Sequence, residues 1–284
     1  MRSASLRFGT SSWSEKSWVG PFYPAGTRPA DMLAFYATEF PTVEADTTYY
    51  RIPSREMVRG WRAKTPEGFL LAAKFPRSVV HGGEGATPAK PDGKTVLAWE
   101  KVGRDVEQFL EVMGELGPKC GPLVVQLPYL NRGAFAGLPE FLERLEHFLH
   151  RLPPGFRYAV EVRNKSWIGP ELLGALRERK IALVLVDLAY MPHPADLAER
   201  LDLVTADFVY ARLIGDRAAV EAQTKTFDRI VIDQGARLDR WTRLLLDLSP
   251  RVRETFAYAN NHYAGFGPGT IRDLLRRVEA GLDE

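Results

Sequence analysis

Charged and amide side chains recur where apolar, strand-like runs of this sequence end. The clearest case is Tyr258-Ala-Asn-Asn-His-Tyr263, in which an apolar run passes directly into Asn260, Asn261 and His262. Polar groups close six other apolar runs in the same way: Glu44 and Asp46, Lys74, Gln126, Glu161 and Arg163, Asp187, and Arg212. Buried parallel strands tolerate a charge only where it is paired or faces a cavity. We interpret these groups as the wall of a binding site; a self-satisfied network of ion pairs and amides is the alternative.

Three of these groups have side chains suited to catalysis. Glu161 is the candidate general base, and His262 is the candidate acid or the group that orients the base. Lys74 is a candidate Schiff-base amine if it is desolvated, although a structural ion pair is the favoured alternative for this lysine. Two carboxylates across a cavity would also fit glycoside hydrolysis, where their separation decides the outcome.

The cations among these groups favour an anionic ligand. Arg163, Arg212 and Lys74 on one face could hold a phosphate or a carboxylate. Alternatively, Arg163 pairs with Glu161 or Glu44 and Arg212 pairs with Asp187, and both interpretations can hold at once. The remaining candidate ligand contacts are Glu44, Gln126, Asp187, Asn260, Asn261 and Trp13.

Strand alternation divides the last polar run. Side chains two residues apart share a side of a strand, so Asn260 and His262 are expected to point at the ligand together. Asn261 then points the other way and is expected to anchor a turn or a loop. The last strand should also lie beside the first one and face Ser11 and Trp13.

Metal ligation has little support in the sequence. Glu44, Glu161, Asp187 and His262 could form an oxygen-rich site, but no motif such as H-E-x-x-H accompanies them. We expect no tightly bound transition metal, and the identity of any cofactor stays open.

Strand-length and helix-length runs alternate along the whole chain. The predicted strands are 6–13, 42–50, 69–76, 123–128, 158–163, 181–187, 208–214 and 255–259. The predicted helices are 29–40, 54–64, 102–116, 139–149, 170–179, 238–248 and 270–278. Eight strands, most of them followed by a helix, indicate parallel pairing and a single (β/α)8 TIM-type barrel over residues 1–284. An open doubly wound sheet is the alternative, but the first strand leads into Thr10-Ser-Ser-Trp13 rather than into a glycine-rich dinucleotide turn.

Two connections are long for a compact domain, and both follow strands. They run from His81 to about Lys101, after the third strand, and from Gly215 to about Gln234, after the seventh. In a barrel both would lie on the C-terminal face, where long loops serve as lids or binding loops.

Composition limits the compartment and the partners. The single cysteine, Cys120, excludes an internal disulfide, no run of about 18 apolar residues predicts a membrane span, and the first ten residues lack a signal-peptide core. We therefore expect a cytoplasmic protein, and we expect it to be a monomer. A net charge of +2 gives no overall support for nucleic acid, although a local basic patch remains compatible with it.

The chain resembles the family called domain of unknown function 72, or YecE-like, over nearly its whole length. The matching stretches are GTSSWS at 9–14, FYP at 22–24, TVEADTTYYRIP at 42–53, FLLAAKFPRSVVH at 69–81, GPLVVQLP at 121–128, RYAVEVRNKSW at 157–167, YARLIG at 210–215 and NNHYAGFGP at 260–268. The resemblance implies a TIM-type barrel and carries no settled activity. Its polar signature falls on Glu44, Lys74, His81, Gln126, Glu161, Arg163, Asp187, Arg212, Asn260, Asn261 and His262.

Three positions depart from the family pattern. Asp46 stands where asparagine is common, and Asn164 and Ile214 stand where histidine is common. The last two remove imidazoles from the site, which weakens a metal site built on histidines.

These residues together predict an enzyme that acts on a small polar ligand with an anionic group, a sugar or nucleotide derivative, at the C-terminal face of the barrel. A nucleic-acid-processing or nucleic-acid-binding barrel, by analogy of fold with metal-dependent endonucleases, and a non-catalytic ligand-binding barrel are the alternatives.

Overall fold

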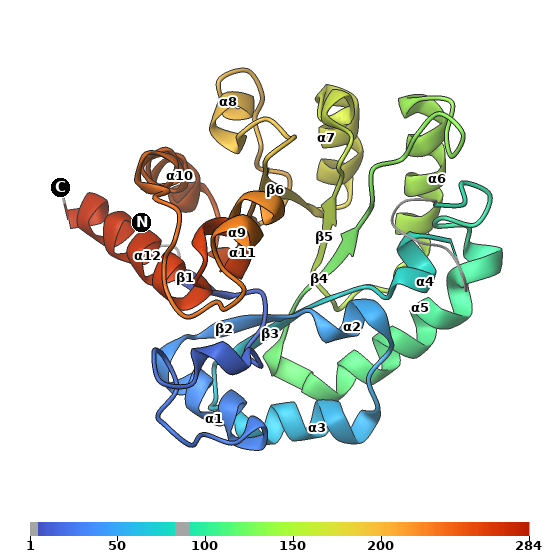
Figure 1. Cartoon of the computed structure of the whole chain (residues 1–284). Helices are drawn as coiled ribbons and strands as arrows, with labels where there is room; N and C mark the ends of the chain where they lie inside the picture. The colour runs from blue at the N-terminus through green and yellow to red at the C-terminus, as the bar shows by residue number, and fades with distance from the viewer. Residues whose placement is uncertain (1–4, 83–90, 284) are drawn as a thin grey trace.

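Eight parallel strands form a nearly closed barrel inside a ring of helices (Figure 1). The computed structural model describes residues 5–82 and 91–283. Neighbouring strands follow the order β1-β8-β7-β6-β5-β4-β3-β2. Their bounds are β1 Ser5–Thr10, β2 Thr42–Ala45, β3 Leu70–Lys74, β4 Cys120–Gln126, β5 Tyr158–Glu161, β6 Ala182–Leu188, β7 Phe208–Gly215 and β8 Glu254–Ala259. The predicted TIM-type barrel is therefore confirmed.

Seven longer helices cover the outside of the strands. They are α1 Pro29–Glu39, α3 Arg55–Lys64, α5 Trp99–Met113, α6 Leu138–Arg151, α7 Pro170–Glu178, α10 Gly235–Leu248 and α12 Gly267–Asp283. Shorter helices are α2 Thr47–Tyr50, α4 Arg77–Val80, α8 Pro194–Ala198, α9 Arg217–Gln223 and α11 Asn261–Ala264, with 3-10 turns η1 Lys16–Trp18, η2 Gly114–Lys119, η3 Lys165–Trp167 and η4 Ser249–Arg251. Within the described residues, no helix is both long enough and apolar enough to cross a membrane.

Local sequence explains where several helices begin. The Ser54 side chain accepts a hydrogen bond from the backbone N–H of Met57 and so caps α3. Pro29 and Pro170 occupy first-turn positions of α1 and α7, where a missing N–H costs nothing. In α10, the buried residues Leu238 and Trp241 begin the apolar stripe that the sequence predicted.

The second strand is shorter than predicted. The expected strand over 42–50 ends at Ala45, and the chain turns at Asp46, whose backbone is helical, into α2. The Thr48 side chain lies within hydrogen-bonding distance of the carbonyls of Ala45 and Lys74, at 3.0 and 2.8 Å, and fixes this turn. The first strand likewise ends at Thr10 rather than at Trp13.

Both predicted long loops leave the C-terminal ends of strands, but they are not devoid of secondary structure. The chain after β7 forms α9, and the Asp216 side chain caps this helix by accepting from the N–H of Ala219. The connection after β3 begins with α4 and contains residues 83–90, which lie outside the described residues.

The barrel has one seam, between β1 and β2. These strands occupy the two ends of the strand order, and no ladder joins them in the described chain. The phenol of Tyr36, on α1, bridges the two backbones instead: it accepts from the N–H of Thr10 at 2.8 Å and donates to the carbonyl of Thr42 at 3.2 Å. One side chain from the outer layer thus replaces a missing strand–strand hydrogen bond.

Gly9 is the residue at which the seam tolerates no side chain. A Cβ atom at this position would lie 2.1 Å from the carbonyl oxygen of Thr42 and 2.9 Å from the Tyr36 hydroxyl. We expect Gly9→Ala to lower the free energy of unfolding by about 2–3 kcal/mol, measured by urea denaturation, because β1 must move away from β2. Gly174→Ala is the matched control, since a Cβ there meets nothing within 4 Å and alanine is the better helix former. Equal midpoints for the two variants would contradict close approach at the seam.

Candidate active site at the C-terminal end of the barrel

Strand alternation directs most of the predicted polar groups into the barrel. One apolar cluster fills its interior and contains Ala159 of β5 and Tyr210 of β7. Glu161 and Arg212 each lie two residues further along those strands, and they therefore point inward as well. Glu44, Lys74 and Gln126 occupy the equivalent inward positions at the ends of β2, β3 and β4. These groups lie at the C-terminal end of the strands, where TIM-barrel active sites are found.

Arg212 is the centre of a buried network. Its Nε and Nη2 donate to Glu44 Oε1 at 3.2 and 2.8 Å. Its Nη1 donates to Gln126 Oε1 at 2.8 Å and to Glu161 Oε2 at 2.5 Å. Tyr210 completes the set by donating to Glu44 Oε2 at 2.7 Å. Arg212 therefore pairs with Glu44 and Glu161, and its predicted pairing with Asp187 is wrong.

Glu161 is fully buried, and both of its oxygens accept from arginines. Arg163 Nε donates to Oε1 at 2.9 Å, and Arg212 donates to Oε2. Burial alone would raise the pKa of Glu161, but Arg212 and Arg163 outweigh burial and hold this pKa below its ordinary value. The carboxylate is thus stabilised in its ionised form, which makes it a weak proton acceptor in this state.

Lys74 is held by its surroundings on β3. Its Nζ forms an ion pair with Asp46 Oδ1 and lies 5.5 Å from the centre of the Tyr49 ring. The Tyr49 hydroxyl and His81 Nε2 are 2.6 Å apart, so His81 lies beside the same group. These contacts fit the structural ion pair that was the alternative to a Schiff-base role.

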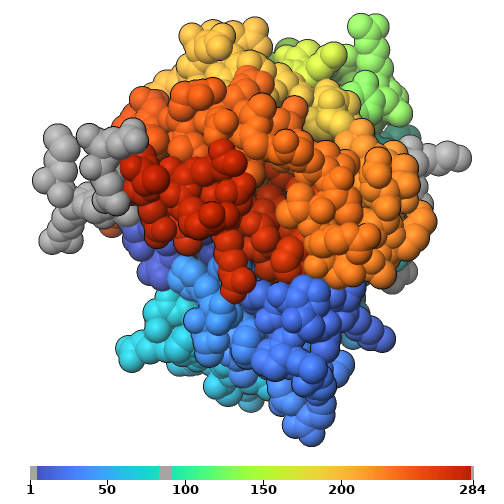
Figure 2. All heavy atoms as spheres, turned by 60° about the vertical axis from the view of Figure 1, so that its left-hand side comes forward, coloured from blue at the N-terminus to red at the C-terminus, as the bar shows by residue number. Residues whose placement is uncertain are grey.

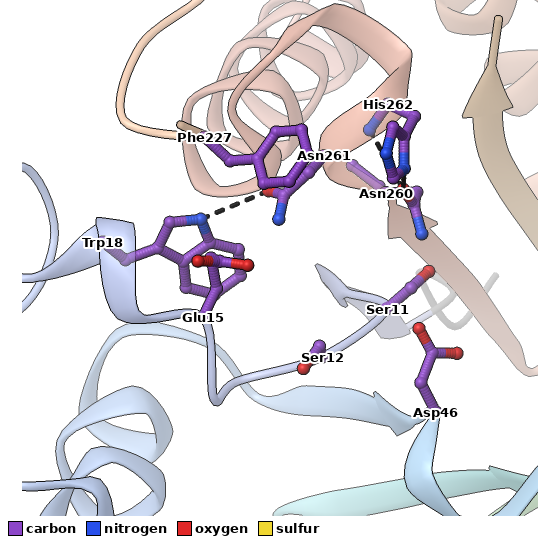
Figure 3. A pocket seen from close by; sticks show the side chains of 10 residues that line it. Ser11, Ser12, Glu15, Trp18, Asp46, Phe227, Asn260, Asn261 and His262 are labelled. Carbon is purple, nitrogen blue, oxygen red and sulfur yellow. Dashed lines mark hydrogen bonds between the residues drawn. The ribbon is translucent and has the colours of Figure 1, made fainter. Parts of the chain in front are cut away.

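A cavity of about 180 Å³ opens beside this network (Figure 3). Figure 2 shows that the C-terminal segment, the segment near residues 215–235 and the N-terminal segment meet on one face of the molecule. The cavity is lined by Ser11, Ser12, Glu15, Trp18, Asp46, Phe227, Ala259, Asn260, Asn261 and His262. The Ser11 hydroxyl is buried there and has no hydrogen-bond partner among the described residues. Asp46 joins the cavity to the buried network, because its carboxylate also binds Lys74.

Asn260 and His262 lie together on one wall of the cavity (Figure 3). Asn260 Oδ1 accepts from the backbone N–H of His262 at 3.0 Å and lies 2.9 Å from His262 Nδ1. Strand alternation does not produce this arrangement, since β8 ends at Ala259 and Asn260 caps α11. The predicted shared side is therefore reached by a helical turn rather than by a strand.

Two titratable groups of the cavity have pKa values that move in opposite directions. Burial raises the pKa of Asp46, and Glu44 adds to the rise while Lys74 opposes it. Burial lowers the pKa of His262, helped by Arg217 and opposed by Glu221, whose Oε1 lies 3.3 Å from His262 Nε2. The raised pKa of Asp46 and the lowered pKa of His262 bring the two groups closer in acidity, a combination suited to proton transfer.

Asn261 fastens the loops around the cavity. Its Oδ1 accepts from Trp18 Nε1 at 3.2 Å and from the backbone N–H of Gly267 at 2.9 Å. It therefore ties the chain after β1 to the start of α12, the loop-anchoring role that the sequence predicted. Its side chain also borders the cavity, so its assignment as a ligand contact stays a prediction.

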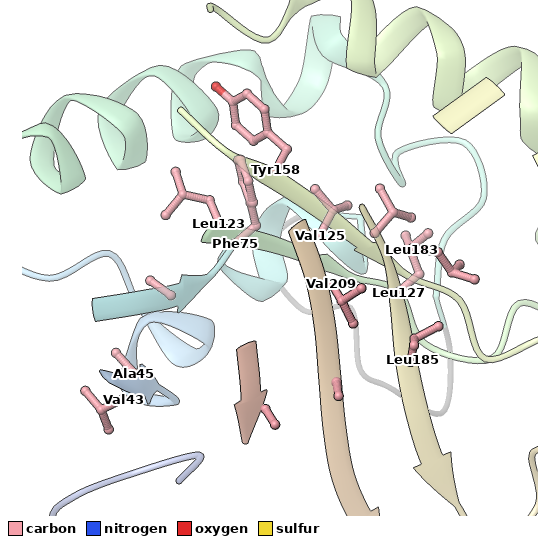
Figure 4. Close-up of a cluster of buried hydrophobic side chains, with 14 of the residues drawn as sticks. Val43, Ala45, Phe75, Leu123, Val125, Leu127, Tyr158, Leu183, Leu185 and Val209 are labelled. Atoms are coloured by element: carbon pink, nitrogen blue, oxygen red, sulfur yellow. The ribbon is translucent and has the colours of Figure 1, made fainter. Parts of the chain in front are cut away.

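Asp187 lies on the outer side of β6 and not among the inward groups. Leu183 and Leu185, on the same side of this strand, belong to the apolar layer between strands and helices (Figure 4). Asp187 Oδ2 accepts from Trp241 Nε1 at 3.0 Å and from the Tyr263 hydroxyl at 2.9 Å. The register explains this placement: Val186, not Asp187, is opposite the inward Arg212.

Arg237 provides the charge that Asp187 needs. This arginine, on α10, pairs with the Asp187 carboxylate through Nη2, and its Nε lies 3.3 Å from Oδ2. A contact between Asp187 and a ligand in the barrel mouth is therefore not supported by this geometry.

The sequence placed Ser11 and Trp13 opposite the last strand, but it did not assign Ser11 to the site, and it overlooked Phe227. Ser11 is next to Ala259 of β8, to whose carbonyl its N–H donates at 3.1 Å, whereas Trp13 packs edge-on against Trp61 at 5.5 Å and is not a lining residue. Ser11 follows the strand end that the sequence placed beside the last strand, and this adjacency was the available signal. Phe227 had no such signal, because it comes from the middle of a long loop.

No group of three or more His, Cys, Asp and Glu side chains within residues 5–82 and 91–283 is arranged to hold a metal ion. Of the four candidate oxygen and nitrogen ligands, Asp187 faces the helices and His262 borders the cavity, while Glu44 and Glu161 are engaged by Arg212. The expectation about metals stays a prediction.

Comparison with known proteins decides the family. The family described as "Protein of unknown function DUF72" matches residues 7–284 of this chain. The chain belongs to the DUF72 family. A DUF72 structure from Thermotoga maritima is 25% identical, covers 99% of this chain and 100% of its own, and superposes with a TM-score of 0.70. A DUF72 structure from Enterococcus faecalis V583 is 22% identical over 96% of this chain and 95% of its own, with a TM-score of 0.69.

A curated relative supports the same membership. The UPF0759 protein YecE of Escherichia coli K12 is 32% identical over 187 residues, which span 64% of this chain and 59% of YecE. The match thus extends over less than two thirds of that relative. Among more distant barrels, a D-psicose 3-epimerase solved in the presence of D-fructose is 11% identical, covers 98% of this chain and 97% of its own, and has a TM-score of 0.50, a likeness of fold alone.

Proposed function

We propose that this DUF72 protein is an enzyme that transfers protons on a small polar ligand with an anionic group, a sugar or nucleotide derivative. The observation that carries the proposal is the cavity in which Asp46 and His262 have pKa values shifted in opposite directions. They border the same space as the Ser11 hydroxyl, which lacks a partner in the described part of the chain. Such groups gather in active sites because burial and neighbouring charges tune them there.

The arrangement supports new roles for two carboxylates. Asp46 acts as the proton-transfer group, with His262 as its partner, because Glu161 is buried and engaged by two arginines. Glu161 holds Arg212 and Arg163 in place. Arg163, whose side chain is 24% exposed, and Lys74, which binds Asp46, are the cations that we assign to holding the anionic group.

The cavity volume limits the ligand. About 180 Å³ corresponds to roughly six waters at ~30 Å³ each. A small metabolite, or one group of a larger one, fits this space. Since the D-psicose 3-epimerase of similar fold was solved with D-fructose, hexoses and hexose phosphates are the first probes to screen, followed by nucleoside monophosphates.

Asp46→Asn tests the assignment once a thermal-shift screen with these probes has found a substrate. We expect turnover to fall at least about 100-fold at a temperature where the variant remains folded, since general acid–base groups contribute at this scale. The urea midpoint should also fall, because Asp46→Asn removes the charged partner of Lys74. Glu161→Gln is the matched control; it should lower the urea midpoint, because it removes a buried partner of Arg212. Full turnover in Asp46→Asn, or a turnover loss in Glu161→Gln without loss of stability, would return the role to Glu161. Failure of all three probe classes to bind the wild-type protein would contradict the proposed ligand class.

A further inference from the structure

Three tyrosines are exposed at the mouth of the barrel. Tyr50, Tyr129 and Tyr190 have exposed fractions of 68%, 59% and 55%. The other seven tyrosines of the chain are buried or half-buried. Each exposed tyrosine follows the C-terminal end of a strand, namely β2, β4 and β6, so all three lie on the face that carries the cavity. Exposed aromatic rings on the loops of one face offer flat surfaces on which the rings of a partner can stack.

The three exposed tyrosines follow alternate strands of the barrel, β2, β4 and β6. Neighbouring strands lie about 4.8 Å apart, so the ends of alternate strands are separated by roughly 10 Å. The segments that carry the three tyrosines therefore follow an arc over β2 to β6, around half of the barrel mouth. An extended chain of flat units could contact them in succession, whereas one small molecule could not.

The loops that carry this arc are basic. The connections from β2 to α3, β3 to α5, β4 to α6, β5 to α7 and β6 to α8 include the short helices α2 and α4. Their described parts contain five exposed cations: Arg51, Arg77, Lys94, Arg132 and Lys165. Asp92 is the one exposed acid in the same described stretches. None of the five cations forms an ion pair with another described residue, whereas Arg163 and Lys74 beneath them are already paired.

Several cations at the opposite end of the barrel are paired with acids. Between α8 and β7, Asp202 pairs with Arg251 and Arg177, and Asp207 pairs with Arg253. Exposed cations without an ion pair in the described chain also occur at that end, Lys180 between α7 and β6 among them. The arc over β2 to β6 is set apart by exposed cations that lie among three exposed tyrosines, a local pattern that a net charge of +2 does not describe.

We propose that this arc binds single-stranded nucleic acid, with bases stacked on Tyr50, Tyr129 and Tyr190 and phosphates held by the surrounding arginines and lysines. Aromatic rings in a basic groove bind single strands in this way, because every base has a stacking face and every linkage has a charge. An acidic protein would use the cations without needing the rings, and the experiment separates these partners. The proposal concerns binding on the rim and does not require catalysis in the cavity.

The test uses a fluorescein-labelled dT12 oligonucleotide and fluorescence polarisation at several salt concentrations. We expect Tyr129→Ala to weaken binding about tenfold, and Tyr50→Ala and Tyr190→Ala to act in the same direction. Lys165→Ala should weaken binding a few-fold and flatten its salt dependence, because one phosphate contact is lost. Urea denaturation should show that each variant remains folded, since all four side chains are exposed.

Matched controls separate this site from general charge and from the proposed chemistry. Lys180→Ala, an exposed lysine between α7 and β6 at the other end of the barrel, should leave dT12 binding unchanged. Asp46→Asn should also bind dT12 like the wild-type protein. Turnover in the cavity and dT12 binding on the rim are then measured independently, and either proposal can fail without the other. Absence of dT12 binding at low salt would overturn the proposal. Binding that the tyrosine variants leave intact, or equal binding of an acidic peptide, would also overturn it.

Discussion

Arg212→Met is expected to lower the free energy of unfolding by about 3–5 kcal/mol at neutral pH, because it leaves two buried carboxylates without their cation. Glu44 and Glu161 have no exposed surface, and Arg212 donates to both. Urea denaturation followed by far-UV circular dichroism measures the change. Arg28→Met is the control. Arg28 also pairs with a carboxylate, that of Asp31, but the Arg28 side chain is 78% exposed. The urea midpoint of this variant should therefore equal that of the wild-type protein.

The pH dependence of stability should reverse sign in Arg212→Met. In the wild-type protein, the folded-state pKa of Glu161 is lowered, so its contribution is complete above the unfolded pKa of about 4.3 and is lost as the pH falls through the folded pKa. Without Arg212, burial dominates and raises the folded-state pKa of Glu161, so the variant should gain stability as the pH falls toward about 5. A variant whose stability falls with pH in parallel with the wild type would contradict the network.

Replacing the two buried carboxylates that lose their cation should restore part of the lost free energy of unfolding. The triple variant Arg212→Met, Glu44→Gln, Glu161→Gln carries no buried charge at these positions, and the new amide at position 44 would still offer an oxygen to the Tyr210 hydroxyl. We expect it to be more stable than Arg212→Met alone. Equal stability would mean that lost packing, not the unpaired charge, caused the effect.

Asp187→Asn is expected to lower the free energy of unfolding by about 2–3 kcal/mol, because hydrogen bonds to a charged, buried acceptor are stronger than neutral ones. Asp187 holds Trp241 of α10 and Tyr263 of α11 against β6. Thermal and urea denaturation measure the loss. Asp196→Asn is the matched control: Asp196 pairs with Arg240 of the same helix α10, but it is half exposed, so its replacement should cost less than about 1 kcal/mol.

Histidine titration by NMR distinguishes this positioning role from a general loss of stability. Tyr263 is adjacent to His262, so loosening α11 should expose the imidazole and move the pKa of His262 up toward its ordinary value. His193, 3.5 Å from Asp187, should respond in the opposite direction. Burial already lowers its pKa to about 4, and loss of the negative charge of Asp187 should lower it further. Shifts of both histidines in the same direction would contradict this geometry.

Local patterns predicted much of the site because inward-facing positions in a strand are two residues apart. Glu161 at the end of β5 and Glu44 on β2 point inward as alternation allows. Arg163 and Asp46 lie beyond the ends of these strands, and their contacts with Glu161 and Lys74 place them beside the same groups. Alternation cannot decide which of the two sides faces inward, and Asp187 shows this. Its polarity suggested the cavity, but the pairing of Val186 with Arg212 turns it toward α10.

The sequence by itself determined the family, the eight-stranded barrel and the end of it that carries polar side chains, because strand and helix periods are properties of consecutive residues. Only the tertiary structure decided the partners. Arg212 reaches Glu44, which is 168 residues distant in sequence, and Asn261 reaches Trp18, which is 243 residues distant. It also decided that Ser11, Asp46 and His262 border one cavity. Closure of the barrel places β8 beside β1, and contacts created by closure depend on register and side-chain length, which no local period encodes.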